Sequence, residues 1–445
     1  ANTLTLSGGG SLVSGGLTLN DPSSMLLLNS ITVDNVSTTS YSLGLDIDAD
    51  STVTSLLVAN ITPVSIANTK SLSGAITLTA GSIKLNETGT LASTISMSGG
   101  VLVADESLTV SGALTQTADI TIDVATGKTL SYTGAAVNLG AKSMTLSGGG
   151  TLANTNALVL NNADSLLSLS GILTIGDVDG TAASNSGKGI LVTSSATMGD
   201  YDLSAVSYLS LAANQTLAGQ LNLKTNGELK TSGAGQYIGD IALAGGKFSA
   251  TDNQVLGGTL SVTADSELTV SQGYTLTLSQ AGGLALGGNA LTISGGGSLV
   301  SGGVTLNNAD SKLLLNSITL DSASTTADSL GLDVDANSTV TALSIGHITP
   351  VSIATGKSLS GAIAVTAGSL KLNETGTLAS TVTMSGGTLD ADETLTVSGA
   401  LSHSADIAID VATGKTLTYS GAAINLGAKT LTLSGGGTLG NTNAL

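Results

Sequence analysis

The 445-residue sequence has no cysteine, no tryptophan and no arginine, and aromatic residues make up only 2% of it. Without cysteine the chain forms neither disulfides nor thiolate metal sites. Without large rings to fill a wide interior, its core must be built from layers of Leu, Ile, Val and Ala. This predicts a narrow core, which does not fit the three or so globular domains that the length alone would suggest.

Positive charge is also scarce, because 13 Lys stand against 31 Asp and Glu and the net charge is −18. Such a chain repels phosphate backbones and anionic lipid surfaces, so we expect no nucleic-acid partner. The longest strongly apolar run, Met25-Leu26-Leu27-Leu28, is far shorter than the ~20 residues of a membrane helix. We therefore expect no membrane insertion of this segment.

What the sequence does contain is a long internal repeat. Residues 1–158 return as residues 288–445, shifted by 287 without a gap, and 118 of the 158 pairs are identical. A weaker similarity, between residues 158–165 and 304–311, divides the unit again. We predict a full repeat unit at 1–287, with divergent halves at about 1–146 and 147–287, and a partial second copy at 288–445.

The repeat behaves as an array, because the match ends inside the pattern at Leu445. We expect one continuous solenoid without a linker, and a natural chain that continues beyond Leu445.

Short-range patterns predict the fold class. Segments such as Leu4-Thr5-Leu6 and Ile120-Thr121-Ile122 alternate apolar and polar residues, as half-buried strands do, and Gly, Asn and Ser clusters between them predict tight corners. Similar segments recur at nearly equal intervals, from Leu4 to Leu26 and from Leu146 to Leu169. We predict an all-β, parallel β-solenoid (β-helix) of roughly 20 turns, each of ~20–24 residues.

This register predicts which side chains are buried. Residues expected in the core are Leu6, Leu19, Ile122, Leu146 and Leu433, and those expected outside are Lys70, Lys84, Lys128 and Lys142. Pairs that exchange one aliphatic residue for another between copies are also expected inside: Leu6/Ile293, Leu17/Val304, Val33/Leu320, Ile83/Leu370 and Val137/Ile424. Pairs that change character are expected outside: Met25/Lys312, Val103/Asp390, Tyr41/Asp328 and Gln116/His403.

One acidic motif suggests a metal site. Asp46, Asp48 and Asp50 alternate along a strand and return as Asp333, Asp335 and Asn337, and such oxygen ligands suit calcium. An EF-hand loop is excluded, because Ser51 stands where that loop needs Gly and Leu57 where it needs Glu. Calcium is thus the one candidate ligand, no other cofactor is expected, and a solvated acidic edge is the simpler interpretation.

The sequence does not favour an enzyme. Polysaccharide-active β-helices need facing carboxylates in a ring-lined groove, or a strong base beside metal-binding acids. Arg and Trp are absent, and neither histidine is repeated, since His347 matches Asn60 and His403 matches Gln116. No catalytic residue is nominated.

Residues 124–134 (VATGKTLSYTG) and 431–439 (LTLSGGGTL) resemble the repeats of bacterial autotransporter passengers and filamentous-haemagglutinin-type adhesins. The resemblance implies a right-handed parallel β-helix exported to the cell surface. The sequence departs from that pattern in having no secretion domain and no Asn-x-Tyr-x-Gly element.

Together these features predict a structural, extracellular repeat protein at the cell surface, part of a long fibre or a self-assembling filament. Its expected partners are copies of itself or other surface components. One alternative is the stalk of a single-chain adhesin that binds a host or glycan ligand, and a second is a β-helical polysaccharide-active enzyme. A string of immunoglobulin-like sandwiches is disfavoured, because its period of about 90–100 residues and its buried aromatics are missing.

Overall fold

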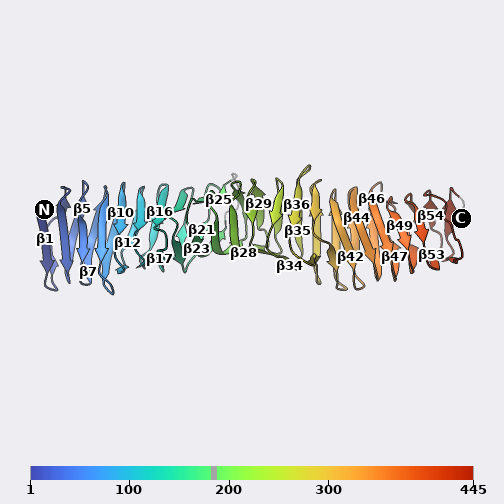
Figure 1. Cartoon of the computed structure of the whole chain (residues 1–445), viewed down its shortest axis with the longest axis horizontal. Helices are drawn as coiled ribbons and strands as arrows, with labels where there is room; N and C mark the ends of the chain where they lie inside the picture. Colours follow the sequence, from blue (N-terminus) through green and yellow to red (C-terminus); the bar gives the residue numbers. More distant parts are fainter. Residues whose placement is uncertain (1, 182–187, 444–445) are drawn as a thin grey trace. The chain divides into compact units, whose positions relative to one another are not determined.

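The chain folds into short β-strands that wind into a parallel solenoid (Figure 1). The computed structural model describes residues 2–181 and 188–443, and across these residues it contains strands and turns but no helix. One sheet receives a single strand from each turn and holds 22 strands. The predicted all-β parallel β-solenoid is therefore confirmed, with about 22 turns.

The solenoid consists of two compact units, Ala1–Leu221 and Asn222–Leu445. The division falls inside strand β28 (Thr216–Lys224), and the sequence repeat begins again only at residue 288. The compact units are thus not the repeat units, and each is described below by itself.

Each turn presents three faces. The first face carries one strand per turn, such as β6 (Gly44–Ile47) and β8 (Thr62–Ile66). The second and third faces share one bent strand in some turns and carry two separate strands in others. For example, β9 (Ser71–Leu78) pairs at its start with β11 (Thr90–Leu91) and at its end with β12 (Thr94–Met97). The faces are called first, second and third below.

The second unit contributes strands to the first and the third face. Its first face includes β29 (Glu228–Ser232), β32 (Lys247–Ala250), β35 (Ser266–Val270), β38 (Ala290–Ser294), β41 (Lys312–Asn316), β43 (Gly331–Val334), β45 (Ile348–Ile353), β47 (Ser369–Leu372), β50 (Thr388–Ala391), β53 (Ile407–Val411) and β55 (Leu431–Ser434). Its third face includes β40 (Val304–Leu306), the second halves of β42 (Thr319–Thr325), β44 (Ser338–Ile345) and β46 (Ser358–Val365), then β49 (Thr381–Met384) and β52 (Leu401–His403).

The strand register follows the predicted spacing. Leu4 pairs with Leu26 and Leu146 pairs with Leu169, so the intervals seen in the sequence each correspond to one turn. Turn length varies, because the turn from Leu26 to Leu45 is shorter than the turn from Leu268 to Ile293. The second copy repeats the lengths of the first: the turn from Leu313 to Leu332 is as long as its counterpart from Leu26 to Leu45. Turn length is therefore a property that the repeat preserves.

Burial alternates along each strand, because side chains at odd and even positions point to opposite sides of the wall. Leu19, Ile122 and Leu146 are buried as predicted, and Lys70, Lys84, Lys128 and Lys142 all keep solvent contact. The aliphatic exchange pairs lie inside, except for Leu6 and Leu17 in the first turn, which are half-buried. The predicted outward positions all retain solvent exposure.

Two core predictions were wrong, and both concern outermost turns. Leu6 is only half-buried, and Leu433 is 52% exposed whereas its counterpart Leu146 is 0% exposed. Leu146 is covered by Leu169 of the following turn, and within the described chain no such turn covers Leu433. The difference shows that a leucine in this fold is buried by the neighbouring turns rather than by its own.

The few aromatic residues are concentrated inside, which the expectation of a purely aliphatic core did not anticipate. Tyr201, Tyr237 and Phe248 are among the largest fully buried side chains, and burial raises the pKa of Tyr201. The Tyr132 hydroxyl donates to the Ala135 carbonyl at 2.6 Å. The Tyr201 hydroxyl likewise donates to Ser207 at 2.7 Å, so these two tyrosines avoid the cost of burying an unpaired polar group, and Phe248 has no such group to pair.

Glycine is required at one bend from the second face to the third, in β9 and in its counterpart β46. At Gly361 (φ +117°) an added Cβ would lie 1.8 Å from the carbonyl oxygen of Val340 in the preceding turn. Gly74, the equivalent residue of the first copy, has φ +116° and the same 1.8 Å approach, to Val53. Only glycine allows the two backbones to come this close.

We predict that Gly361→Ala destabilises the second unit by about 2–3 kcal/mol, because it adds both a strained backbone angle and a clash. Gly356→Thr is the matched control: Gly356 has φ +73° and open space around it, and its counterpart Thr69 adopts φ 66°. Thermal unfolding followed by circular dichroism should show a clear loss only for Gly361→Ala. Equal losses would mean that the close approach is not what selects glycine.

Candidate functional site

The predicted calcium ligands lie where a first-face strand ends and the next corner begins. Asp46 projects outward from β6, half-buried, and Asp48 and Asp50 follow in the corner. The Asp50 carboxylate accepts hydrogen bonds from the backbone N–H and the hydroxyl of Ser71, at 2.8 and 3.0 Å. Asp50 is thus engaged in joining its corner to the next turn.

The second copy explains why Asp50 can be replaced by Asn. The Asn337 side-chain oxygen accepts from the backbone N–H and hydroxyl of Ser358, at 3.0 and 3.2 Å. An amide oxygen and a carboxylate oxygen both perform this task, so the position needs an acceptor and not a charge. The third member of the predicted metal motif is therefore explained by turn-to-turn hydrogen bonding.

The first residue of the predicted metal motif, Asp46 in one copy and Asp333 in the other, has different neighbours in the two copies. Asp333 is paired with Lys312 of the preceding turn, with 2.9 Å between Nζ and Oδ2. In the first copy Met25 occupies the lysine position, and the pKa of Asp46 is raised by burial and by the nearby charge of Asp48. The Met25/Lys312 exchange thus decides whether this half-buried carboxylate has a cationic neighbour.

Asp48 and Asp335 complete the predicted set and lie in the corners beyond β6 and β43. Within residues 2–181 and 188–443, no three Asp, Glu or His side chains gather closely enough to hold a metal ion. The calcium site stays a prediction.

A second acidic cluster lies on the first face of the second copy. Lys371 is 3.2 Å from Asp392 and 3.8 Å from Asp390. Burial, followed by the repulsion of Asp392, raises the pKa of Asp390, although Lys371 opposes the shift. The first copy has Val103 at the Asp390 position, so this cluster is a feature of one copy only.

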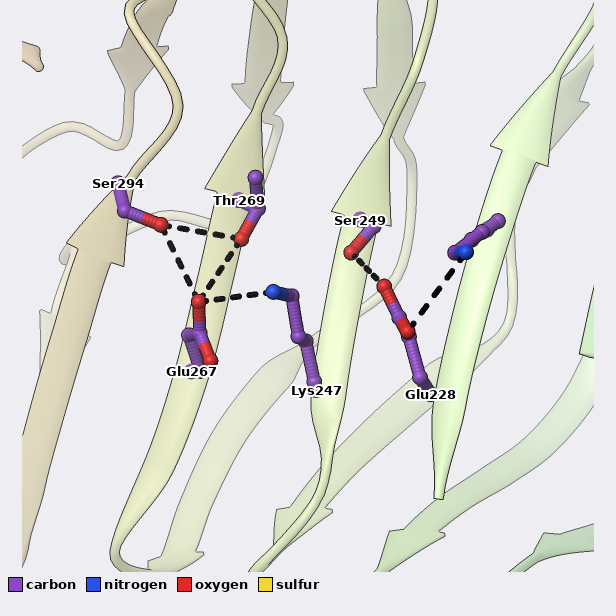
Figure 2. A network of polar contacts seen from close by, with 7 residues as sticks. Glu228, Lys247, Ser249, Glu267, Thr269 and Ser294 are labelled. Carbon is purple, nitrogen blue, oxygen red and sulfur yellow. Dashed lines mark hydrogen bonds and ion pairs between the residues drawn. The ribbon is translucent and has the colours of Figure 1, made fainter. Parts of the chain in front are cut away.

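The most extended polar network was missed by sequence analysis (Figure 2). Glu228, Lys247 and Glu267 occupy the same position on three successive first-face strands, β29, β32 and β35. The Lys247 ammonium lies 2.9 Å from the Glu267 carboxylate, and Ser249 donates to Glu228 at 2.7 Å. Charges of alternating sign therefore stack along this face. The signal that could have found them is the spacing between the three charges, which equals one turn each time.

Glu267 is the best-supported member of this network. It accepts hydrogen bonds from Thr269 at 3.1 Å and Ser294 at 3.2 Å as well as its contact with Lys247 (Figure 2). Burial alone would raise the pKa of Glu267, but the hydrogen bonds and the lysine charge outweigh it and lower the pKa. Because both side chains keep solvent contact, the Lys247–Glu267 pair contributes at most about 1 kcal/mol. The arrangement links neighbouring strands of the first face.

The two histidines are not brought together, because His347 lies in a corner before β45 and His403 ends β52, several turns further along. His347 Nδ1 is 3.7 Å from Asp328 Oδ1, and both side chains are exposed. His403 Nδ1 is 2.9 Å from the Ala405 carbonyl oxygen. Both members of the His347–Asp328 pair differ in the first copy, where Asn60 and Tyr41 take their places. The contact between His347 and Asp328 is therefore not preserved between the two copies of the repeat.

No protein-family model, curated protein or solved structure matches the chain. Among the described residues, no helix has the length and apolar character needed to cross a membrane.

The Met25/Lys312 exchange gives a prediction about charge. In Met25→Lys the new ammonium should reach Asp46 as Lys312 reaches Asp333, and it should lower the raised pKa of Asp46. A raised pKa means that the charged carboxylate opposes folding above that pKa, so the variant should gain up to about 1 kcal/mol at pH 7. The gain should vanish at acidic pH, where Asp46 is protonated.

Carboxyl-carbon NMR titration of Asp46 and thermal unfolding at several pH values measure the two effects. Met25→Gln is the control, since it has similar length and no charge. An Asp46 pKa that is the same in Met25→Lys and Met25→Gln would contradict the assignment of this pair.

Proposed function

We propose that the protein is a structural, extracellular repeat protein that forms part of a long surface fibre or self-assembling filament. The observation that carries the proposal is the preservation of turn length and core between the copies while outward residues change. The register that pairs Leu26 with Leu45 and Leu45 with Val64 is repeated by Leu313, Leu332 and Val351. The repeat thus preserves the register in which successive turns pair with one another.

The outward changes support the same proposal. Lys312 replaces Met25 and Asp390 replaces Val103, so the two copies present different charges from the same wall. A catalytic or ligand-binding constellation duplicated with its repeat would be expected to keep its side chains, whereas a spacer needs only the stack to continue. The resemblance to autotransporter passengers and haemagglutinin-type adhesins supports a place at the cell surface.

Electrostatics sets the conditions for assembly. A net charge of −18 opposes close approach of two copies, and this repulsion is screened over about 10 Å at 0.1 M salt and about 3 Å at 1 M. Association of a structural filament should therefore increase with ionic strength. Calcium bridging at Asp46, Asp48 and Asp50 would add a dependence on chelator.

Light scattering and negative-stain electron microscopy of the full-length protein test the proposal, with salt, calcium and chelator varied separately. We expect multi-copy assemblies whose amount rises with protein and salt concentration. Protein that stays monomeric under every condition would overturn the filament and favour the alternative, a single-chain adhesin stalk. Assembly unaffected by chelation would remove the calcium bridge and leave the filament standing.

A further inference from the structure

On the third face of the second unit, β40, the second halves of β42, β44 and β46, and β49 carry no charged residue, unlike the first face. The nearest carboxylate on these strands is that of Asp321, at the bend of β42, which accepts hydrogen bonds from Ser301 and Gly302. One outward row on the third face runs through Thr305, Ser324, Ser344, Ala364 and Thr383. The corresponding turns of the first face carry Lys312, Asp333, Lys371 and Asp390. In a chain of net charge −18, this row of outward residues offers another copy an uncharged surface, because the Asp321 carboxylate at its edge is already engaged by Ser301 and Gly302.

This uncharged surface is hollowed. A shallow depression of about 350 Å³ lies over β40, β42, β44, β46 and β49, and its lining includes Ser322, Ala342, Ser344, Ala362 and Ala364. We call it the third-face hollow. The buried Leu343 and Ile363 also border it, so its lining is partly aliphatic. The hollow is therefore suited to an apolar side chain rather than to an ion.

The first copy carries larger residues at several of the equivalent positions, although Ser96 stands where the second copy has the larger Thr383. Leu57 stands where Ser344 does, and Leu57 is 40% exposed on the outer side of β7 (Ser51–Val58). At three neighbouring positions the first copy also has the larger side chain. These positions hold Asn35, Ser55 and Thr77 in the first copy and Ser322, Ala342 and Ala364 in the second. The side chains at these four positions are thus larger in the first copy than in the hollowed second copy.

We propose that the third-face hollow receives the Leu57 side chain of a second copy of this chain. The proposal rests on the self-assembly proposed above and assigns the surface through which it occurs. An exposed leucine gains by leaving water, and the small, uncharged side chains that line the hollow permit close approach. The contact joins unlike surfaces, so it can be repeated from copy to copy.

The size of the surface predicts a weak contact. Five stacked strands at about 4.8 Å give a strip about 24 Å long, and a width of about 10 Å gives about 240 Å² per copy. A stable pair of proteins buries about 800 Å² per partner. A single contact should therefore form only at high protein concentration, and many contacts along an array would be needed for a lasting assembly.

The absence of cysteine from the sequence allows a direct test. Leu57→Cys and Ser344→Cys proteins, carrying different tags, are mixed as full chains and oxidised. We expect the mixed disulfide dimer to exceed both same-variant dimers. A Val103→Cys protein is the control, because Val103 lies outward on the first face, in β13 (Val101–Ala104). Mixed dimers no more abundant with Ser344→Cys than with Val103→Cys would overturn the assignment.

Repeat-swap variants provide the second measurement by light scattering. Leu57→Ser and Ser344→Leu each introduce the residue that the sister copy already holds, so the fold should tolerate both, which circular dichroism can check. Each should weaken association by about tenfold, through loss of the leucine or filling of the hollow.

Val103→Asp, the corresponding swap on the first face, should have a smaller effect. Undiminished assembly of both third-face variants would overturn this surface while leaving the filament intact. A wild-type protein that never associates would overturn both proposals.

Discussion

Each turn of this protein can bury its apolar side chains only against the turns beside it, and the rest of the structure depends on that constraint. Leu146 and Leu433 are the same residue of the repeat, yet they are 0% and 52% exposed, because Leu169 covers only the first of them. A turn contains too few residues to enclose a core of its own. Stability therefore resides in contacts between neighbours, as in other repeat proteins.

The same constraint explains which residues are free to change. Inward positions exchange only aliphatic residues, as Val33 and Leu320 do, because any larger change would disturb the two adjoining turns. The carbonyl of the preceding turn leaves no room for a Cβ atom at Gly361. The side chains of Asp50 and Asn337 accept hydrogen bonds from a serine of the following turn. At outward positions such as Met25 and Lys312 no close backbone approach restricts the residue, so charge and shape can change there while the register of the strands is kept.

Much of the fold could be predicted from the sequence because its determinants are local and repeated. Alternating residues predicted the strands, and the spacing between Leu4 and Leu26 predicted their register. The side-chain partnerships were less accessible. Turn length varies along the chain, so partners such as Glu228 and Lys247, or Asp50 and Ser71, follow no single period. Buried tyrosines were missed because their hydroxyl partners depend on the path of a corner.

The candidate surfaces were partly predicted. The acidic motif was found, but the hydrogen bonds of Asp50 to Ser71 and the pairing of Asp333 with Lys312 became visible only when adjacent turns were in place. The third-face hollow has no signature in either copy alone. It emerges from four exchanges, Leu57/Ser344 among them, that the strand register brings side by side.

The most direct test of the account is the removal of one turn. Deleting residues 332–350 removes a whole turn and places Val351 where Leu332 stood, which is the register the two strands already share. The account predicts near-wild-type circular dichroism and a melting temperature within a few degrees. Deleting residues 332–341 removes about half a turn and should abolish the cooperative transition of this region. If the two deletions are equally harmful, or equally harmless, stability does not depend on the stacking of whole turns.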